Sequence, residues 1–228
     1  MSKGKISVRR ELREPDAFIK TTYSVLDYVK KHLKLISIIA VVLVTVGTTA
    51  IGAYWYSRDR NHSAQQLLNQ ALSTLENPPA TEPDKSTSPQ LNTILSSYKN
   101  TKARPVAGYL SANQEYRAGD LSGAAKLYQN NDPAGDRHLK DLQRLGLATI
   151  HFQQKEYADA ISILERMQTE RSFINEDLYL LLGLSYEKSK QTGKAVATYE
   201  NMIQLLQNSI FKPWAEERLI SLRSQAKS

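Results

Sequence analysis

Gly193 and Lys194 are the residues of this 228-residue chain whose types and spacing come closest to a chemical motif. They stand in the run Gln-Thr-Gly-Lys at positions 191–194, and a phosphate-binding loop ends in such a Gly-Lys pair. That loop needs a first Gly, four residues, Gly-Lys and then Ser or Thr, and it opens a helix after a strand. Here the nearest earlier glycine is Gly183, ten residues before Gly193, and Lys194 is followed by Ala195. The motif fails at both ends, so we expect no nucleotide site.

The other residue types that catalyse reactions or bind metals lack the spacing that either task requires. The four histidines belong to no His-Glu-x-x-His or other metal-ligand pattern, and solvated or packed side chains are expected for His32, His62, His138 and His151. The chain has no cysteine, which excludes disulfides, thiolate catalysis and cysteine-based metal sites. No Gly-x-Ser-x-Gly elbow or Gly-rich dinucleotide fingerprint occurs. We therefore predict a protein that is not an enzyme, with no catalytic residue, metal, cofactor or small-molecule substrate.

The strongest signal is an uncharged apolar run from Leu35 to Tyr56. As a helix this run would be roughly 33 Å long, which matches the hydrocarbon core of a bilayer. Tyr54, Trp55 and Tyr56 close the run with rings of the kind that sit at a membrane interface. The sequence predicts a transmembrane helix over 35–56. A cleaved signal peptide is the competing interpretation, but the run and its leader are long for one.

Positive charge is concentrated before the predicted span. Residues 1–34 contain nine Lys or Arg and four acids, which accounts for five of the net charges in the total of +7. The ten residues after the span contain only two Lys or Arg residues, Arg58 and Arg60. By the positive-inside rule the N-terminal tail should stay in the cytoplasm while the rest of the chain crosses. The basic total is then a topology signal, and we expect no nucleic-acid partner.

Between the tail and the C-terminal half, three segments connect the predicted parts. Phe18, Val25, Val29 and Leu33 fall on one helical face, which fits either a solvated lead-in to the span or a cytoplasmic docking helix. Residues 57–76 have helical apolar spacing and are predicted to form a connector. Residues 77–89 contain four prolines and are predicted to be an extended linker.

The C-terminal half repeats a helix-hairpin pattern. The pattern of small and bulky residues expected of a tetratricopeptide repeat occurs in full once, in Tyr179, Leu182, Gly183, Tyr186, Ala195 and Tyr199. Two upstream units repeat part of it, with Ala148, Ala160 and Leu164 in one and Ala112, Ala124 and Tyr128 in the other. The small residues 112, 148 and 183 are 36 and 35 apart, and each precedes an alanine by twelve residues. Two helices approach closely only where both present small residues, so this spacing predicts packed hairpins.

The predicted fold is all-α, with one N-terminal transmembrane helix followed by a short tetratricopeptide-repeat solenoid and a C-terminal capping helix. The predicted parts are a basic cytoplasmic tail with an amphipathic helix (1–34), the transmembrane helix (35–56), the helical connector (57–76), the Pro-rich linker (77–89) and the repeat domain (90–228). Within the last, repeats are expected over about 105–138, 141–174 and 176–209, and the capping helix over 213–226, where Trp214 continues the repeat frame.

This layout resembles the single-span bacterial inner-membrane proteins related to the ancillary subunit of the Sec translocon. The resemblance implies a single-pass protein of the bacterial inner membrane with its repeats in the periplasm. It also implies a non-enzymatic, chaperone-like scaffold that serves as a translocon accessory. An alternative is a structural subunit of another membrane complex, in which the small residues Gly47 and Gly52 help the span to pack against other helices.

Partner proteins are expected to bind the first helix of each repeat, which lines the concave surface of such arrays. The candidate contacts are Tyr109, Asn113, Tyr116, Arg117, Leu145, Thr149, Phe152, Gln153, Leu184, Glu187 and Lys188. This mixture of aromatic, aliphatic and single charged residues suits an extended peptide or a helix. For some of them, such as Phe152 and Leu184, a place in the core between repeats is the alternative.

Overall fold

The computed structural model describes residues 26–76, 88–170 and 176–225, and all regular structure within them is α-helical. The predicted all-α class is therefore confirmed. The chain divides into two compact units, residues 1–58 and 59–228, which are described separately. Most of the predicted basic tail, nearly all of the Pro-rich linker and the end of the second predicted repeat lie outside the described residues.

The first unit contains the apolar part of helix α2 (Leu33–Glu76), which covers both the predicted span and the predicted connector. This helix is long and apolar enough to cross a membrane. Its polar side chains near the middle do not conflict with that, because the hydroxyls of Thr45, Thr48 and Thr49 donate to carbonyl oxygens of their own helix at 2.9–3.0 Å. In hydrocarbon no water would replace such bonds, so internal satisfaction of these groups is a condition for burial in lipid.

The second unit begins with the last turns of α2. Ala64, Leu68 and Ala71 are buried against Leu91 and Ile94 of α3 (Pro89–Ser97) and against the start of α4. Their spacing of four and three residues places them on one face of α2. The predicted connector thus packs against α3 and α4 within the compact unit that begins at Asp59, whereas the repeat domain was predicted from residue 90.

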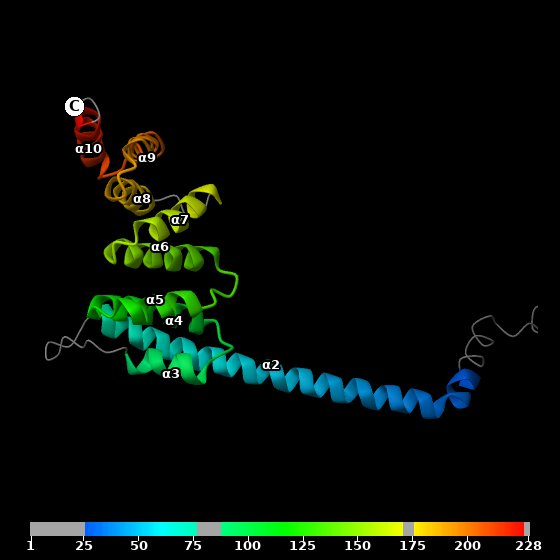
Figure 1. Cartoon of the computed structure of the whole chain (residues 1–228). Helices are drawn as coiled ribbons and strands as arrows, with labels where there is room; N and C mark the ends of the chain where they lie inside the picture. The colour runs from blue at the N-terminus through cyan, green and yellow to red at the C-terminus, as the bar shows by residue number, and fades with distance from the viewer. Residues whose placement is uncertain (1–25, 77–87, 171–175, 226–228) are drawn as a thin grey trace, which may run out of the picture. The chain divides into compact units, whose positions relative to one another are not determined.

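Three antiparallel hairpins follow in chain order, as Figure 1 shows from green to orange. They pair α4 (Ala103–Ala118) with α5 (Leu121–Asn130), α6 (Arg137–Gln153) with α7 (Tyr157–Thr169), and α8 (Glu176–Lys188) with α9 (Thr192–Leu205). The first helices also contact one another, α4 with α6 and α6 with α8. All twelve residues of the repeat pattern are buried in these helices.

The turns inside the hairpins share one conformation. Each has a residue with positive φ at the same place in the frame, namely Gly119 (φ 89°), Lys155 (φ 64°) and Lys190 (φ 62°). The next backbone N–H then donates to the carbonyl five residues back, as in Asp120 to Glu115, Glu156 to His151 and Gln191 to Tyr186, at 2.8–3.0 Å. This is the Schellman arrangement that ends a helix. Because three turns close in the same way, the hairpins are equivalent in backbone as well as in sequence.

The third hairpin is held by a close contact between Gly183 and Tyr199. A Cβ built on Gly183 would lie 2.3 Å from Cε1 of Tyr199, so only glycine leaves room for the ring. Tyr199 is fully buried, and its hydroxyl donates to Glu187 Oε1 at 2.7 Å. The small residue on the first helix therefore leaves room for the aromatic residue of the second.

The array ends in α10 (Lys212–Gln225), which packs on α9. Ala215, Leu219 and Leu222 face the core, while the ring of Trp214 meets that of Tyr199 edge-on with centroids 5.6 Å apart. This helix supplies the capping layer that a solenoid needs to cover its last apolar surface.

Candidate functional site

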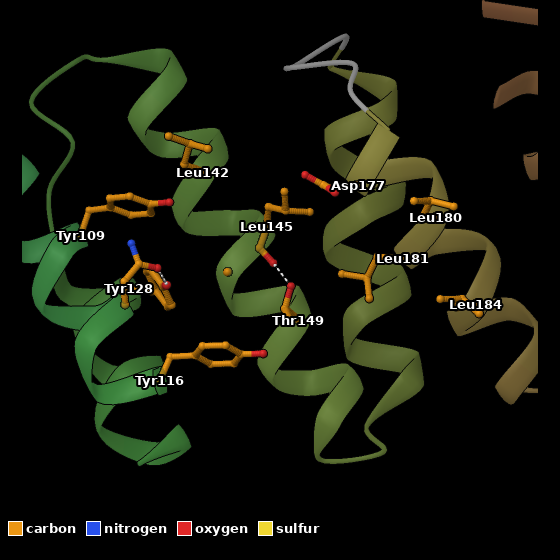
Figure 2. A pocket seen from close by; sticks show the side chains of 12 residues that line it. Tyr109, Tyr116, Tyr128, Leu142, Leu145, Thr149, Asp177, Leu180, Leu181 and Leu184 are labelled. Carbon is orange, nitrogen blue, oxygen red and sulfur yellow. Dashed lines mark hydrogen bonds between the residues drawn. The ribbon is translucent and has the colours of Figure 1, made fainter. Parts of the chain in front are cut away.

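A groove of about 430 Å³ crosses the first helices of the three hairpins (Figure 2). Tyrosines of α4 stand on one side of it and leucines of α8 on the other, with side chains of α6 between them. Its lining residues are Tyr109, Asn113 and Tyr116 of α4, Tyr128 of α5, Leu142, Leu145, Gly146 and Thr149 of α6, and Asp177, Leu180, Leu181 and Leu184 of α8.

The position of the groove follows from the repeat frame. Asn113, Thr149 and Leu184 each come one residue after the small residue of their first helix, so they hold equivalent places in the three hairpins. Since the first helices pack side by side, equivalent positions form a row that runs from helix to helix. The groove is built from such rows.

Six of the eleven predicted contacts line this groove, namely Tyr109, Asn113, Tyr116, Leu145, Thr149 and Leu184. Phe152 lies outside the lining and meets the ring of Tyr157 with centroids 5.5 Å apart. Gln153 donates from its amide to the hydroxyl of Tyr116. Arg117 and Lys188 are exposed beyond the groove. The structure thus brings together the predicted contacts of α4, α6 and α8 up to Tyr116, Thr149 and Leu184 and leaves the later residues of each helix outside the groove.

Glu187 is also outside the groove, because its carboxylate is used within the fold. It accepts hydrogen bonds from the Arg218 guanidinium of α10 and from the Tyr199 hydroxyl. The bond to Glu187 raises the pKa of Arg218, and burial followed by the same carboxylate raises the pKa of Tyr199. Glu187 therefore joins the capping helix to the third hairpin instead of facing a partner.

Six lining residues were not among the predicted contacts: Tyr128, which was expected only as part of the repeat pattern, and Leu142, Gly146, Asp177, Leu180 and Leu181. A signal for two of them exists, because Leu142 and Asp177 come seven residues before Thr149 and Leu184 and so share their helix face. Gly146 lines the groove because Tyr128 of the preceding hairpin occupies the space that its side chain would need, with Cζ 2.6 Å from a built Cβ. That contact joins two neighbouring repeats, so the residue pattern of a single repeat does not predict it.

The chemistry of the groove is apolar with a few fixed polar groups. The Tyr128 hydroxyl donates to Asn113 Oδ1 at 2.6 Å, and burial raises the pKa of Tyr128, so this tyrosine stays neutral. Thr149 donates to the carbonyl of Leu145 at 2.8 Å. The polar atoms are thus partly satisfied within the protein, while the leucines of α6 and α8 present apolar surface. Such a lining favours an apolar or amphipathic binding partner.

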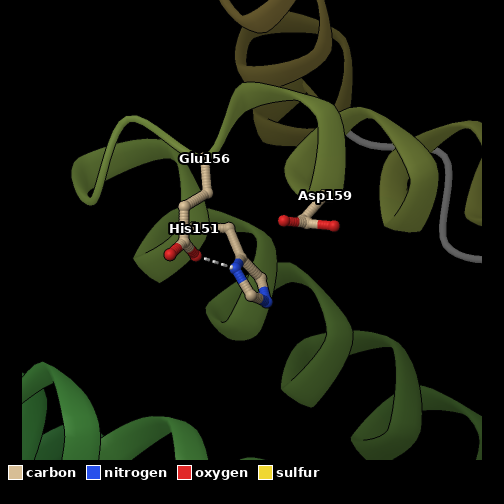
Figure 3. A group of neighbouring side chains, drawn as sticks. All are labelled: His151, Glu156 and Asp159. Carbon is tan, nitrogen blue, oxygen red and sulfur yellow. Dashed lines mark hydrogen bonds and ion pairs between the residues drawn. The ribbon is translucent and has the colours of Figure 1, made fainter.

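Outside the groove, the structure also brings together His151, Glu156 and Asp159 at the turn between α6 and α7 (Figure 3). The His151 Nδ1 and Glu156 Oε2 are 2.7 Å apart, and donor atoms of all three lie within 4.8 Å of one another. These are donor types that a divalent cation uses, but both carboxylates are exposed. Each residue also suits its helix end, with His151 in the last turn of α6 and the two acids at the start of α7. A hydrogen bond between His151 and Glu156 that closes the turn accounts for the cluster.

The hairpin array and its groove define a helical-repeat protein of the kind that binds other proteins. A model of the tetratricopeptide repeat-like domain matches residues 27–226, so the chain belongs to that family. Searches of curated proteins and of solved structures returned no match.

Proposed function

We propose that this protein is a membrane-anchored scaffold that binds segments of other proteins in the groove across α4, α6 and α8. The observation that carries the proposal is the groove itself, because leucines from two helices remain half-buried on a surface that the described part of the chain does not cover. The open form and apolar lining suit a peptide or a helix better than a small polar substrate. A non-enzymatic role is part of the proposal, since leucine and tyrosine side chains make up most of the lining.

The anchor is the apolar part of α2, with one crossing of a lipid bilayer. Trp55 and Arg58 support this placement, because the Arg58 guanidinium lies 5.7 Å from the Trp55 ring centre at the end of the apolar run. An aromatic ring and a cation together fit the membrane interface. From the charge of the tail we propose that the N-terminus is cytoplasmic and that the repeats lie on the opposite side of the membrane. In the inner membrane of a bacterium, that side is the periplasm.

The orientation is testable with a reporter fused after Ser228. We expect activity from a reporter that works only outside the cytoplasm, and none from one that works only inside it. Removal of Arg9, Arg10 and Arg13 from the tail should lower the first activity, since these charges hold the tail in place. Activity of the cytoplasmic reporter alone would reverse the proposed topology.

The layout resembles translocon accessories, so our finer proposal is an accessory role in protein export or envelope protein assembly. The alternative is a structural subunit of another membrane complex, with Gly47 and Gly52 at a helix interface; neither glycine has a neighbour within 4 Å of a built Cβ. Crosslinking in intact membranes followed by mass spectrometry separates the two. Translocon components or many exported proteins support the first role, whereas one fixed set of partners in constant ratio supports the second.

A further inference from the structure

One edge of the groove carries a charged row that the proposed function has not used. Arg117, Gln153 and Lys188 each come four residues after Asn113, Thr149 and Leu184 on the same helices. We name this set the basic row, after the two cations at its ends. Residues four apart share a helix face and lie about 6 Å apart along the axis. The basic row therefore runs beside the groove from α4 to α8. All three of its side chains are exposed.

Most acidic residues near this edge have partners of their own. Four of them are engaged in a hydrogen bond or another polar contact within the protein, namely Glu115, Asp120, Glu156 and Glu187, and the exposed Asp159 lies beside Glu156. Two further exposed cations, Lys155 and Lys190, stand in the turns that follow α6 and α8. The opposite edge has only Asp177 in its equivalent row, beside Val106 and Leu142. The groove is thus apolar at its floor, and exposed cations stand along one side, where the row of Arg117, Gln153 and Lys188 contains no acid.

Arg117 and Lys188 also lie in the last turns of their helices, where a cation interacts favourably with the helix dipole and stabilises the helix. That structural role would not make the groove select among ligands. Selection by charge is therefore the property that distinguishes a binding row from a helix-end effect.

We propose that the groove takes an amphipathic protein segment whose apolar face meets the leucines and whose carboxylates meet the basic row. This inference rests on the proposed function and specifies the partner's chemistry. A guanidinium can bind a carboxylate through two hydrogen bonds, and an ammonium offers a second point of attraction. A segment with basic residues in the same places would meet like charges, which is how charged rims exclude wrong partners.

The test uses the full chain in nanodiscs of zwitterionic lipid, and fluorescence anisotropy of three labelled amphipathic peptides, with empty nanodiscs as the blank. The first peptide has leucines on one face and glutamates beside them, the second has lysines in place of the glutamates, and the third has serines in place of the leucines. We expect the Leu/Glu peptide to bind at least about tenfold more tightly than either of the others at low salt. Added salt should shrink its advantage over the Leu/Lys peptide.

Two paired variants complete the test. Arg117→Glu with Lys188→Glu should reverse the preference so that the Leu/Lys peptide binds more tightly. Lys126→Glu with Lys140→Glu changes the net charge equally at exposed sites away from the groove, and should leave the preference unchanged.

The outcomes separate this inference from the proposed function. If the Leu/Glu and Leu/Lys peptides bind equally and Leu145→Glu abolishes both, the acidic partner is wrong while the groove remains a binding site. Equal binding of the serine peptide would mean that the cations attract any anion, which also overturns the inference. If no peptide binds, the inference fails, and the groove is judged by partner crosslinking alone.

Discussion

Replacing Gly183 with alanine is expected to destabilise the protein by about 2 kcal/mol, although alanine is the better helix former by about 1 kcal/mol. The reason is the ring of Tyr199, since a Cβ at position 183 would lie 2.3 Å from Cε1 and 2.5 Å from Cζ. This ring cannot swing aside, because it is fully buried and in contact with Trp214. The measurement is the urea midpoint of unfolding of the full chain in detergent, followed by circular dichroism.

Gly193 provides the matched control in the same hairpin. It lies in the first turn of α9, and a Cβ built on it has no neighbour within 4 Å. Gly193→Ala should leave the urea midpoint unchanged or raise it. The corresponding gain in the free energy of unfolding should be less than about 1 kcal/mol. Equal effects of the two substitutions would show that the close contact of Gly183 does not hold the hairpin together.

Tyr199→Ala is expected to have the larger effect, a loss of about 3–5 kcal/mol, which is the range for truncating a large buried aromatic side chain. Tyr199 contributes to three helices at once, since it fills the space beside Gly183 on α8, belongs to α9 and meets Trp214 of α10. Hydrogen exchange measured by mass spectrometry should show lost protection in α8, α9 and α10. Exchange in α4 and α5 should change little, because a repeat array transmits stability mainly between neighbours.

Tyr199→Phe separates the ring from the hydroxyl. It removes only the hydrogen bond to Glu187, which keeps its contact with Arg218, so a cost of about 1 kcal/mol is expected. A cost of Tyr199→Phe as large as that of Tyr199→Ala would mean that the polar cluster, and not packing, joins α10 to the array.

The hairpins were predictable because their contacts recur at fixed spacing. Gly183, Ala195 and Tyr199 each have a defined place in the repeat, and the two upstream units repeat the same separations. The connector was harder to place, since Ala64, Leu68 and Ala71 have helical periodicity but no repeat pattern. Their burial depends on α3, which packs against them from beyond a proline-rich segment.

The groove was predictable where it follows the frame and unpredictable where it depends on one particular side chain. Asn113, Thr149 and Leu184 follow from the frame alone. Gly146 does not, because its role depends on the ring of Tyr128 from the hairpin before it. Glu187 occupies a frame position that should face a partner, yet Arg218 of the capping helix binds it, and no local pattern specifies that pairing. The turn residues Lys155 and Lys190 have positive φ angles, which glycine adopts most readily. Their residue type therefore did not predict this backbone conformation.

Site-specific photo-crosslinking in intact membranes tests the protein-binding groove most directly. A photoreactive side chain at Leu184 samples the groove, and one at the exposed Ser162 of α7 samples a surface outside its lining. We predict discrete protein adducts from position 184, none of them from position 162, and their loss when Leu145→Glu is added at an unchanged protein level. The same adducts from both positions, or adducts from position 184 that survive Leu145→Glu, would contradict a function based on the groove.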